Sequence, residues 1–244
     1  MSNPILAIDA SNLICRAYTS QADHTLDSLQ ADLNDRVQQA RQRTQARAVV
    51  AALDAPVNWR ARLYEQYKGG RNPKPPVLRE ALDRAGEMMR AAGARTYAGP
   101  DLEADDVLAT MAAKNPGRTV LMTTDRDLYA AVNDRVQILD MKRHLLGPLE
   151  VETRLGVPPH KVPLLKALAG DSSDNIPGVA LIGTKSAPMI CMTAATPDEA
   201  VDQASRHRYP RHLNARILAG QDDLRRWYHL TCLRVGDIHE VKHP

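Results

Sequence analysis

The residues in this sequence that could do chemistry are carboxylates, and the densest group of them lies at residues 102–106. Glu103, Asp105 and Asp106 occupy three of these five positions, and apolar residues follow at helical spacing. Acids in the first turn of a helix stabilise its positive N-terminal end, which is one interpretation of the group. The other is a cation site, because the group carries more negative charge than a helix terminus needs.

Other aspartates are expected to join this group at one edge of a parallel sheet. Three apolar runs are interpreted as buried strands, and acids follow each of them: Asp9 after 5–8, Asp54 after 47–53, and Asp125 and Asp127 after 119–123. A single aspartate after a strand is ordinarily a turn or cap residue. In an open α/β sheet, however, ligands bind beyond the carboxyl ends of the strands, so these acids should lie together. Such a gathering is unfavourable unless cations lie within it.

Basic and aromatic side chains alternate in residues 58–71. If this stretch is helical, four of them share one side of the helix: Tyr64, Tyr67, Lys68 and Arg71. Such a surface suits phosphates and stacked bases. The alternative is a partly buried aromatic stripe beside solvated charges. The pattern alone leaves both interpretations open.

A turn bounded by Gly170 and Gly178 follows one predicted helix and precedes the start of another. This arrangement aims backbone N–H groups at a phosphate, and Lys185 could pair with the same anion. The turn also contains Asp171 and Asp174, which add two acids one helical turn apart. The turn is therefore a candidate for both anion and cation binding.

The elements that must position these residues alternate between strands and helices. Helices are predicted at 27–43, at 77–92, from the acids of 103–106 to about 115–117, and at 161–168, with further strands at 93–97 and 136–139 and a turn at 10–12. The alternation predicts an α/β fold with a parallel sheet and helices on both faces. The remainder, 188–244, is predicted to be helical and is basic. A basic run is usually a solvated face, but beside a phosphate-binding turn it can extend a nucleic-acid footprint.

The composition is that of a globular protein with its own core. The chain has 244 residues, of which 43% are hydrophobic although none is Phe, and its net charge is +3. Cys15, Cys191 and Cys232 are far apart and odd in number, so we expect neither a zinc site nor disulfides. No signal peptide or membrane span is evident, and we expect a cytoplasmic protein with no membrane partner.

Four pieces of the sequence, in this order, resemble the bacterial and phage 5′-nuclease (flap endonuclease) family, which includes the 5′–3′ exonuclease domain of DNA polymerase I. They are Asp9 after the first strand, the stretch 63–71 after Asp54, the acids of 103–106 with 124–127, and the turn 170–178 with 182–187. The resemblance runs from residue 5 to residue 187. It implies a PIN-like parallel sheet flanked by helices, with a helical arch at about 72–92 and a C-terminal helix–three-turn–helix region. The implied domains are a catalytic domain at 1–157, including the arch, and a DNA-binding region at 158–244.

The resemblance also implies roles for particular residues. One Mg²⁺ or Mn²⁺ ion would lie around Asp9, Asp54, Asp105 and Asp106, and a second near Asp125, Asp127, Asp171 and Asp174, with Glu103 nearby. Lys68 and Arg71 would contact the scissile phosphate, and the candidates for DNA contact are Arg16, Tyr64, Tyr67 and Lys185. A K⁺ ion would be bound by the backbone carbonyls of Leu168, Ala169, Pro177, Val179 and Ile182. Independently, clustered carboxylates select Mg²⁺ or Mn²⁺, and two such ions can activate a water and neutralise a leaving oxygen.

The sequence departs from the family pattern at two positions. Leu181 stands where the family often has Gly, and Pro188 interrupts the helix expected after Ala187. Both bear on K⁺ and duplex binding rather than on catalysis, since all nine acids are present. The expected partners are DNA with 5′ flaps, 5′ ends or branched junctions, RNA primers on DNA, and a separate DNA polymerase. We expect the chain to act as a stand-alone, monomeric nuclease.

Two other functions compete with that of a 5′–3′ exonuclease and flap endonuclease. A PIN-type ribonuclease would share the sheet and the acids but cut RNA, and the element at 170–187 argues against it because that element serves duplex DNA in the family. A structure-specific DNA-binding protein that does not cut would keep the same fold. The full acid set opposes this second alternative, because unused carboxylates crowded together cost stability. We therefore expect a metal-dependent nuclease of DNA replication or repair.

Overall fold

The computed structural model describes residues 3–242, which form two compact units. The first unit comprises residues 3–59, 72–147 and 234–242, and the second comprises 60–71 and 148–233. Across residues 3–242, no helix is both long and apolar enough to cross a membrane. Within residues 3–242, Cys15, Cys191 and Cys232 form no disulfide.

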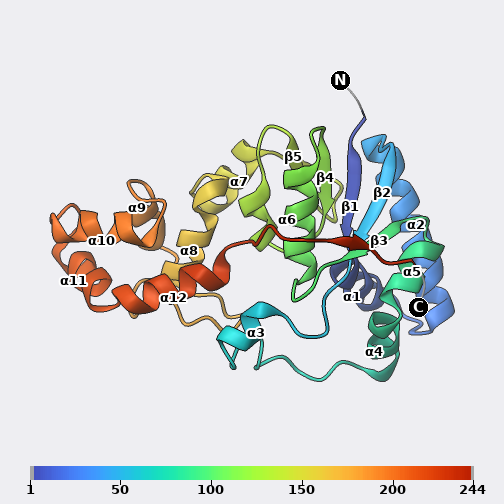
Figure 1. Ribbon diagram of the computed structural model, residues 1–244, viewed down its shortest axis with the longest axis horizontal. Helices are drawn as coiled ribbons and strands as arrows, with labels where there is room; N and C mark the ends of the chain where they lie inside the picture. Colours follow the sequence, from blue (N-terminus) through green and yellow to red (C-terminus); the bar gives the residue numbers. More distant parts are fainter. Residues whose placement is uncertain (1–2, 243–244) are drawn as a thin grey trace. The chain divides into compact units, whose positions relative to one another are not determined.

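Seven strands form the sheet of the first unit, in the order β6-β5-β4-β1-β2-β3-β7 (Figure 1). They are β1 (Ile5–Asp9), β2 (Ala48–Ala52), β3 (Arg95–Ala98), β4 (Thr119–Met122), β5 (Val136–Leu139), β6 (Leu145–Leu146) and β7 (His239–Glu240). The five strands from β5 to β3 run parallel, and the two edge strands pair antiparallel to their neighbours. The predicted parallel α/β sheet is confirmed, with two short antiparallel edges in addition.

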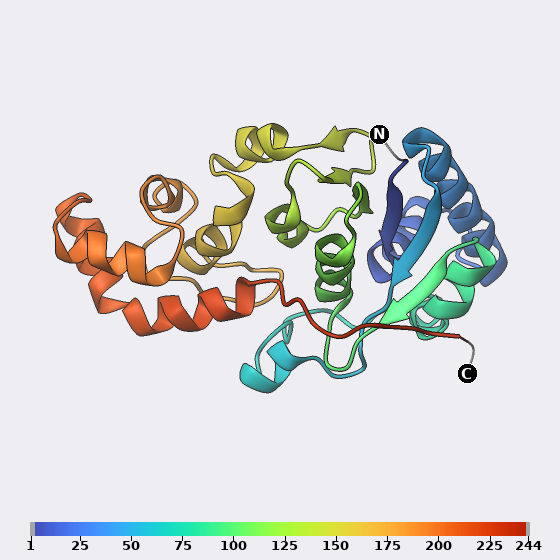
Figure 2. The same cartoon turned by 45° about the horizontal axis from the view of Figure 1, so that its top comes forward.

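Helices cover both faces of this sheet. In Figure 2 the blue and blue-green helices lie together on one side of the strands and the green α6 lies on the other. The first layer contains α1 (Ala10–Ser20), α2 (Leu26–Thr44), α4 (Pro76–Asp83) and α5 (Ala85–Ala91), and α6 (Ala104–Lys114) packs on β1, β2 and β3 from the opposite face. Strand side chains alternate in direction, so Leu6 and Ile8 enter the core under α1 and α2. Leu, Ile, Val, Ala and Met fill that core, as expected for a chain without Phe.

Helix α1 begins directly after β1, where the sequence had predicted a turn, so that prediction was wrong. Asp9 is its N-cap residue, and the carboxylate accepts a hydrogen bond from the backbone N–H of Asn12 at 2.9 Å. Such a cap satisfies one of the backbone N–H groups that every helix start leaves without a partner. Ala10, Leu13, Ile14 and Ala17 then bury one side of the helix.

The predicted helix at 77–92 is present as two helices, α4 and α5, which meet at Arg84. Leu78, Ala81, Ala85 and Met89 are buried in the core of the first unit. The helical part of the segment expected to form an arch therefore packs on the core. Residues 69–76, just before it, are exposed.

The second unit is helical. Its elements are α3 (Trp59–Leu63, whose first residue belongs to the first unit), α7 (Pro148–Leu155), η2 (Pro159–Lys161), α8 (Val162–Ala169), α9 (Ala187–Cys191), α10 (Pro197–Ser205), α11 (Arg211–Ala219) and α12 (Gln221–Thr231). Helix α8 packs on α12, and α10 packs on α11. The helix predicted at 161–168 is confirmed. The prediction of one helical side through 64–71 was wrong, because α3 ends at Leu63 and Lys68 has a φ of 57°, which no α-helix allows.

Two positions that depart from the family pattern have local explanations. The prediction that Pro188 interrupts a helix was wrong, because Pro188 lies in the first turn of α9. Proline is tolerated there because the missing N–H would have had no partner in the helix. Leu181 has a φ of 62°, in the left-handed region that glycine adopts without strain.

The C-terminal segment is not helical throughout, contrary to the prediction for 188–244. After α12 the chain becomes extended and ends in β7, which pairs antiparallel with β3. The short run of polar residues around β7 gave no strand pattern. The sheet edge supplied by β3 provides the pairing that the local sequence does not indicate.

Candidate metal centre

Three aspartates of the first unit converge beyond the sheet. Carboxylate oxygens of Asp105, Asp125 and Asp127 all lie within 4.8 Å of one another. Asp105 is in the first turn of α6, and the other two follow β4, at the start of the 3₁₀ helix η1 (Asp127–Ala131). Within this loop the backbone N–H of Asp127 donates to Asp125 Oδ1 at 2.9 Å. Three carboxylates in this spacing form a donor set that suits a hard divalent cation.

Asp9 adds a buried negative charge beside this cluster. Its Oδ2 accepts a hydrogen bond from Thr123 Oγ1 at 3.2 Å, and its Oδ1 caps α1. Burial raises the pKa of Asp9 to about 7, and the nearby charges of Asp54 and Asp125 act in the same direction. A divalent cation among these groups would offset that repulsion. Both the negative charge around Asp9 and the three carboxylates of the cluster therefore favour a bound metal ion.

Asp54 is both a capping residue and a member of the acid group, the two roles that the sequence left open for acids at strand ends. Its Oδ1 accepts a hydrogen bond from the backbone N–H of Ala104 at 2.9 Å, at the start of α6, and its Oδ2 accepts one from Ser11 Oγ at 2.5 Å. It thus links the ends of β2, α1 and α6. Its charge also acts on Asp9, so it belongs to the same electrostatic group.

Asn12 and Thr124 connect the start of α1 to the loop that carries Asp125 and Asp127. The sequence analysis did not predict a role for either residue. Asn12 Oδ1 accepts hydrogen bonds from Thr124 N at 3.1 Å and Thr124 Oγ1 at 3.0 Å. The exposed Arg16 donates from Nε to Thr124 Oγ1 at 3.2 Å, which brings this DNA-contact candidate to the edge of the acid group. An amide residue shortly after a strand is a common turn signal, so nothing in the sequence distinguished Asn12 as a bridge.

Glu103 and Asp106 lie on either side of Asp105 in sequence but do not belong to its cluster. Glu103 is the buried N-cap residue of α6, and its side chain makes no capping hydrogen bond. Asp106 is fully buried, and its Oδ2 accepts a hydrogen bond from Trp59 Nε1 at 3.0 Å. Its Oδ1 accepts another from the backbone N–H of Arg234 at 2.8 Å.

Asp174 is the centre of a second cluster, inside the second unit. Its buried carboxylate accepts hydrogen bonds from Tyr67 Oη at 2.9 Å and Arg71 Nη2 at 3.1 Å, and Lys68 Nζ lies 3.9 Å away. The backbone N–H of Lys68 also donates to the backbone oxygen of Asp174 at 3.1 Å. The predicted phosphate contacts and a predicted metal ligand thus come together, although more than 100 positions of sequence separate them.

Asp171 has a cationic partner of its own. Lys166 Nζ lies 2.7 Å from its Oδ2, and Ser173 donates two hydrogen bonds to its Oδ1. Burial favours a higher pKa for Asp171, but Lys166 and Ser173 outweigh burial and hold the pKa below its usual value. Asp171 is therefore an anion whose charge is already balanced.

The rings of Tyr64 and Tyr67 are both buried. Tyr64 meets Trp227 edge-on, with ring centroids 5.2 Å apart, and the guanidinium of Arg226 lies 5.3 Å from the Tyr64 centroid. Their burial fits the second interpretation of the 58–71 pattern, a partly buried aromatic stripe. DNA contact by Tyr64 and Tyr67 stays a prediction.

The predicted K⁺ carbonyls lie around the turn after α8. The backbone oxygen of Leu168 accepts from Val179 N at 2.9 Å, and that of Val179 accepts from Ile182 N at 3.0 Å. Gly178 is required there, because a Cβ would lie 2.4 Å from the backbone nitrogen of Gly170. The other predicted carbonyls belong to Ala169, Pro177 and Ile182. Lys185, three residues after Ile182, is exposed.

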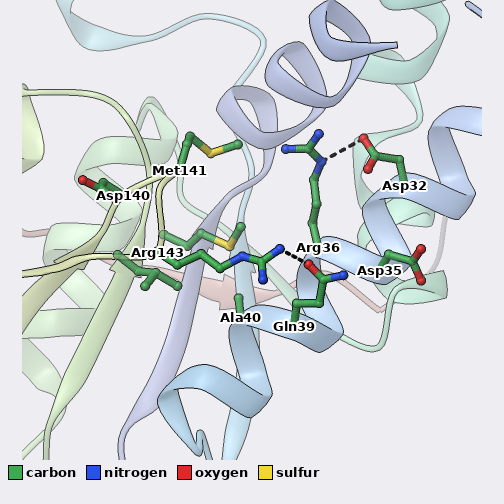
Figure 3. Close-up of a pocket in the computed structure, with 10 residues that line it drawn as sticks. Asp32, Asp35, Arg36, Gln39, Ala40, Asp140, Met141 and Arg143 are labelled. Carbon is green, nitrogen blue, oxygen red and sulfur yellow. Dashed lines mark hydrogen bonds and ion pairs between the residues drawn. The ribbon is translucent and has the colours of Figure 1, made fainter. Parts of the chain in front are cut away.

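A separate pocket of about 220 Å³ lies elsewhere in the first unit, between α2 and the residues that follow β5 (Figure 3). Its lining includes none of the predicted site residues. Arg36 points to Asp32, with an Nε–Oδ2 distance of 2.8 Å, and Arg143 points to Gln39. The guanidinium groups of Arg36 and Arg143 thus already have partners, and the pocket is not part of the metal centre.

The chain is similar in sequence to known nucleases and polymerases. Residues 4–156 match the family model described as 5′–3′ exonuclease, N-terminal resolvase-like domain. Flap endonuclease Xni of Pseudoalteromonas translucida (strain TAC 125) is 32% identical over 213 residues, covering 83% of each chain. Thermostable DNA polymerase I of Thermus thermophilus is 35% identical over 199 residues, which cover 80% of this chain and 24% of the polymerase.

Solved structures give the same fold. The T5 5′-exonuclease with bound zinc superposes with a TM-score of 0.79, covering 93% of this chain and 89% of that one. A complex of the T5 D15 flap endonuclease with DNA and metal ions superposes with a TM-score of 0.75. Both are 21% identical to this chain, so the likeness is one of fold.

Proposed function

The chain belongs to the 5′–3′ exonuclease family, and we propose that it hydrolyses DNA at 5′ flaps and 5′ ends with divalent ions held by its carboxylates. Membership of this family makes the chain a nuclease. The observation that carries the proposal is the convergence of Asp105, Asp125 and Asp127 within 4.8 Å. Asp9 and Asp54 supply further negative charge at the same edge of the sheet.

The proposed cofactor is Mg²⁺ or Mn²⁺, because the available donors are carboxylate oxygens. When bound, such an ion lowers the pKa of a water and stabilises negative charge on a phosphodiester. The residues of this chain contribute a fixed donor set. Asp125 is held by its own turn and Thr123, and the neighbouring loop is held by Asn12. Little rearrangement is therefore needed when an ion binds.

Lys68 and Arg71 are the proposed contacts to the scissile phosphate, where positive charge stabilises the negative charge that develops in hydrolysis. In the absence of DNA, Asp174 is their partner. A phosphate that takes up Lys68 and Arg71 leaves Asp174 with an unbalanced charge. A second divalent ion near Asp171 and Asp174 would restore the balance, which links phosphate binding to the proposed second ion.

The second unit is the proposed duplex-binding part, as the resemblance implies for 158–244, with catalysis assigned to 1–157. The turn between Gly170 and Gly178 has the compact backbone that such an element needs. K⁺ binding at this turn, DNA contact by Arg16, Tyr64, Tyr67 and Lys185, and an arch at about 72–92 remain part of the proposal. So do RNA primers as substrates, a separate DNA polymerase as partner, a monomeric state and a cytoplasmic setting.

A panel of end-labelled substrates tests this function. It contains a 5′ flap, a nicked duplex, a 3′ flap, single-stranded DNA and a single-stranded RNA, each with Mg²⁺ and with EDTA. We expect Mg²⁺-dependent cuts close to the junction of the 5′ flap and stepwise loss of nucleotides at the nick. The 3′ flap should stay intact.

The same panel distinguishes the competing functions. Cleavage of RNA with no preference for the 5′ flap would favour a PIN-type ribonuclease. Tight binding of the 5′ flap without any cut in Mg²⁺ or Mn²⁺ would favour a binding protein. Either result would contradict the proposed function.

A further inference from the structure

The two adjacent aspartates of α6 have different surroundings, which their sequence does not reveal. Asp105 lies with Asp125 and Asp127 in the metal centre. Successive residues of an α-helix point about 100° apart, so Asp106 must face elsewhere. It faces Trp59 and the start of the C-terminal segment, both in the first unit.

Asp106 has the contacts of an anchor. Its side chain is completely buried, and each oxygen accepts a hydrogen bond, at 3.0 Å from Trp59 Nε1 and at 2.8 Å from Arg234 N. The guanidinium of Arg234 lies over the Trp59 ring, 3.9 Å from its centroid. These two donors hold the completely buried carboxylate toward Trp59 and Arg234 and not toward Asp125 and Asp127.

The anchored segment, residues 234–241, is called the C-terminal strap here. In Figure 1 the red strap runs across α6 to β3. It is held to α6 because Gly236 N donates to Thr110 Oγ1 at 3.1 Å and Lys114 Nζ donates to the Gly236 oxygen at 3.0 Å. Its far end joins the sheet, where Val241 N donates to the oxygen of Thr96 at 2.8 Å.

One glycine allows this close passage. A Cβ at Gly99 would lie 2.6 Å from the backbone oxygen of Asp237. The strap is thus fitted to α6 along its length, from the first turn at Asp106 to the last turn at Lys114. Fixing the first turn on this side also fixes the direction in which Asp105 points.

We propose that Asp106 is a positioning residue and not a metal ligand: its carboxylate anchors Trp59 and the C-terminal strap to α6, and so keeps Asp105 facing Asp125 and Asp127. This inference rests on the proposed metal centre. It assigns different tasks to two neighbouring acids that the family resemblance had placed together at one ion.

The test measures Mn²⁺ binding to the full chain by the loss of the free-ion EPR signal, and strap protection by amide hydrogen exchange. The variants are Asp106→Asn, Trp59→Phe, and the two combined. Trp59→Phe removes one donor to Asp106 and leaves every carboxylate in place. Asp134→Asn, an exposed change outside the strap and the acid group, is the matched control.

If Asp106 positions Asp105, both single variants should weaken Mn²⁺ binding about 10-fold. They should also raise exchange at Gly236 about 10-fold or more. The double variant should bind Mn²⁺ no more weakly than the weaker single variant, because both changes break one connection. Asp134→Asn should match the wild type in both measurements. Should Asp106→Asn fail to fold, Arg234→Ala, which keeps the backbone donor, should give a smaller change in the same direction.

Three results would overturn the inference in distinguishable ways. If Asp106 is a ligand, Trp59→Phe will leave Mn²⁺ binding unchanged or tighter while Asp106→Asn weakens it. If both variants loosen the strap but leave Mn²⁺ affinity unchanged, Asp106 anchors the strap but does not position Asp105. If the wild type binds no Mn²⁺, the proposed metal centre itself fails, whereas hydrogen exchange still reports on the anchor.

Discussion

At the residue scale, the chemistry depends on which cations or hydrogen-bond donors offset the negative charge of each carboxylate. Asp171 and Asp174 have cationic partners in the second unit, and Asp106 has two neutral donors. Asp9 has neither a cation nor enough donors to offset its burial, and its pKa is raised to about 7. The charge that most needs a metal ion is therefore at the end of β1.

This imbalance predicts a pH dependence of stability in metal-free protein. Because the pKa of Asp9 is raised in the folded state from an ordinary 3.8, the folded state binds more protons between about pH 4 and pH 7, and stability falls as pH rises through that window. Asp9→Asn removes the penalty. In EDTA its Tm should exceed that of the wild type by about 5 °C at pH 8, and the difference should shrink towards pH 4.

Thermal unfolding of both proteins at pH 4, 6 and 8 measures the effect. Asp134→Asn, an exposed change, serves as the control. Added Mg²⁺ should raise the Tm of the wild type most at pH 8, where Asp9 is ionised. A wild type that is more stable at pH 8 than Asp9→Asn in EDTA would contradict the account.

Arg71 supports a second prediction at this scale. Its guanidinium pairs with Asp174 and its side chain is half exposed, so it can exchange this partner for a phosphate. Arg71→Ala should slow single-turnover cleavage about 10²–10³-fold and leave Mn²⁺ binding by the first unit unchanged. Arg79→Ala, exposed on α4, is the control. An unchanged cleavage rate in Arg71→Ala would remove Arg71 from the mechanism.

Sequence reasoning succeeded at this scale where acids follow strands, because parallel topology brings strand ends together. It therefore predicted that the acids of 103–106 and those at the strand ends gather at one edge of the sheet. It did not predict their grouping, because the resemblance had assigned Asp105 to one ion and Asp125 and Asp127 to the other. It could not separate Asp105 from Asp106, because the helix direction is set by Trp59 and Arg234, which are distant in sequence. The cluster around Asp174 depends equally on contacts across about 100 residues.

At the element scale, long periodic segments were predictable and short ones were not. The buried strands β1, β2 and β4 and the helix α2 follow clear apolar patterns. Helix α1 was missed because its start depends on the Asp9 cap, and β7 because it depends on the edge of β3. In each case a partner outside the segment decides its structure.

The turn between α8 and α9 carries a prediction at this scale. Leu181 has a φ of 62° and is 78% exposed, so the backbone is strained and the side chain contributes little packing. Leu181→Gly should relieve the strain and raise Tm by about 1–3 °C, net of the greater freedom of glycine in the unfolded chain. Leu181→Ala, which keeps a Cβ, should give no such gain. A lower Tm for Leu181→Gly than for Leu181→Ala would show that the strain is absent.

At the scale of the whole molecule, the chain crosses between its two units more than once. Residues 60–71 belong to the second unit although residues on both sides of them belong to the first, and the strap returns to the first unit at residue 234. The predicted phosphate contacts thus lie in the unit that is proposed to bind duplex DNA. The metal centre and the strap lie in the other. The net charge of +3 could not predict how the chain divides into two units. That division depends on the order in which the elements are packed.

The central claim is that carboxylates of the first unit hold the ions with which the chain cuts DNA. The most direct measurement is the single-turnover cleavage rate of a 5′-flap duplex at saturating Mg²⁺ for the wild type, Asp125→Asn and Asp134→Asn. We predict that Asp125→Asn binds the flap as the wild type does but cuts it about 10³-fold more slowly, while Asp134→Asn cuts at the wild-type rate. Cleavage by Asp125→Asn at the rate of the wild type would contradict the account.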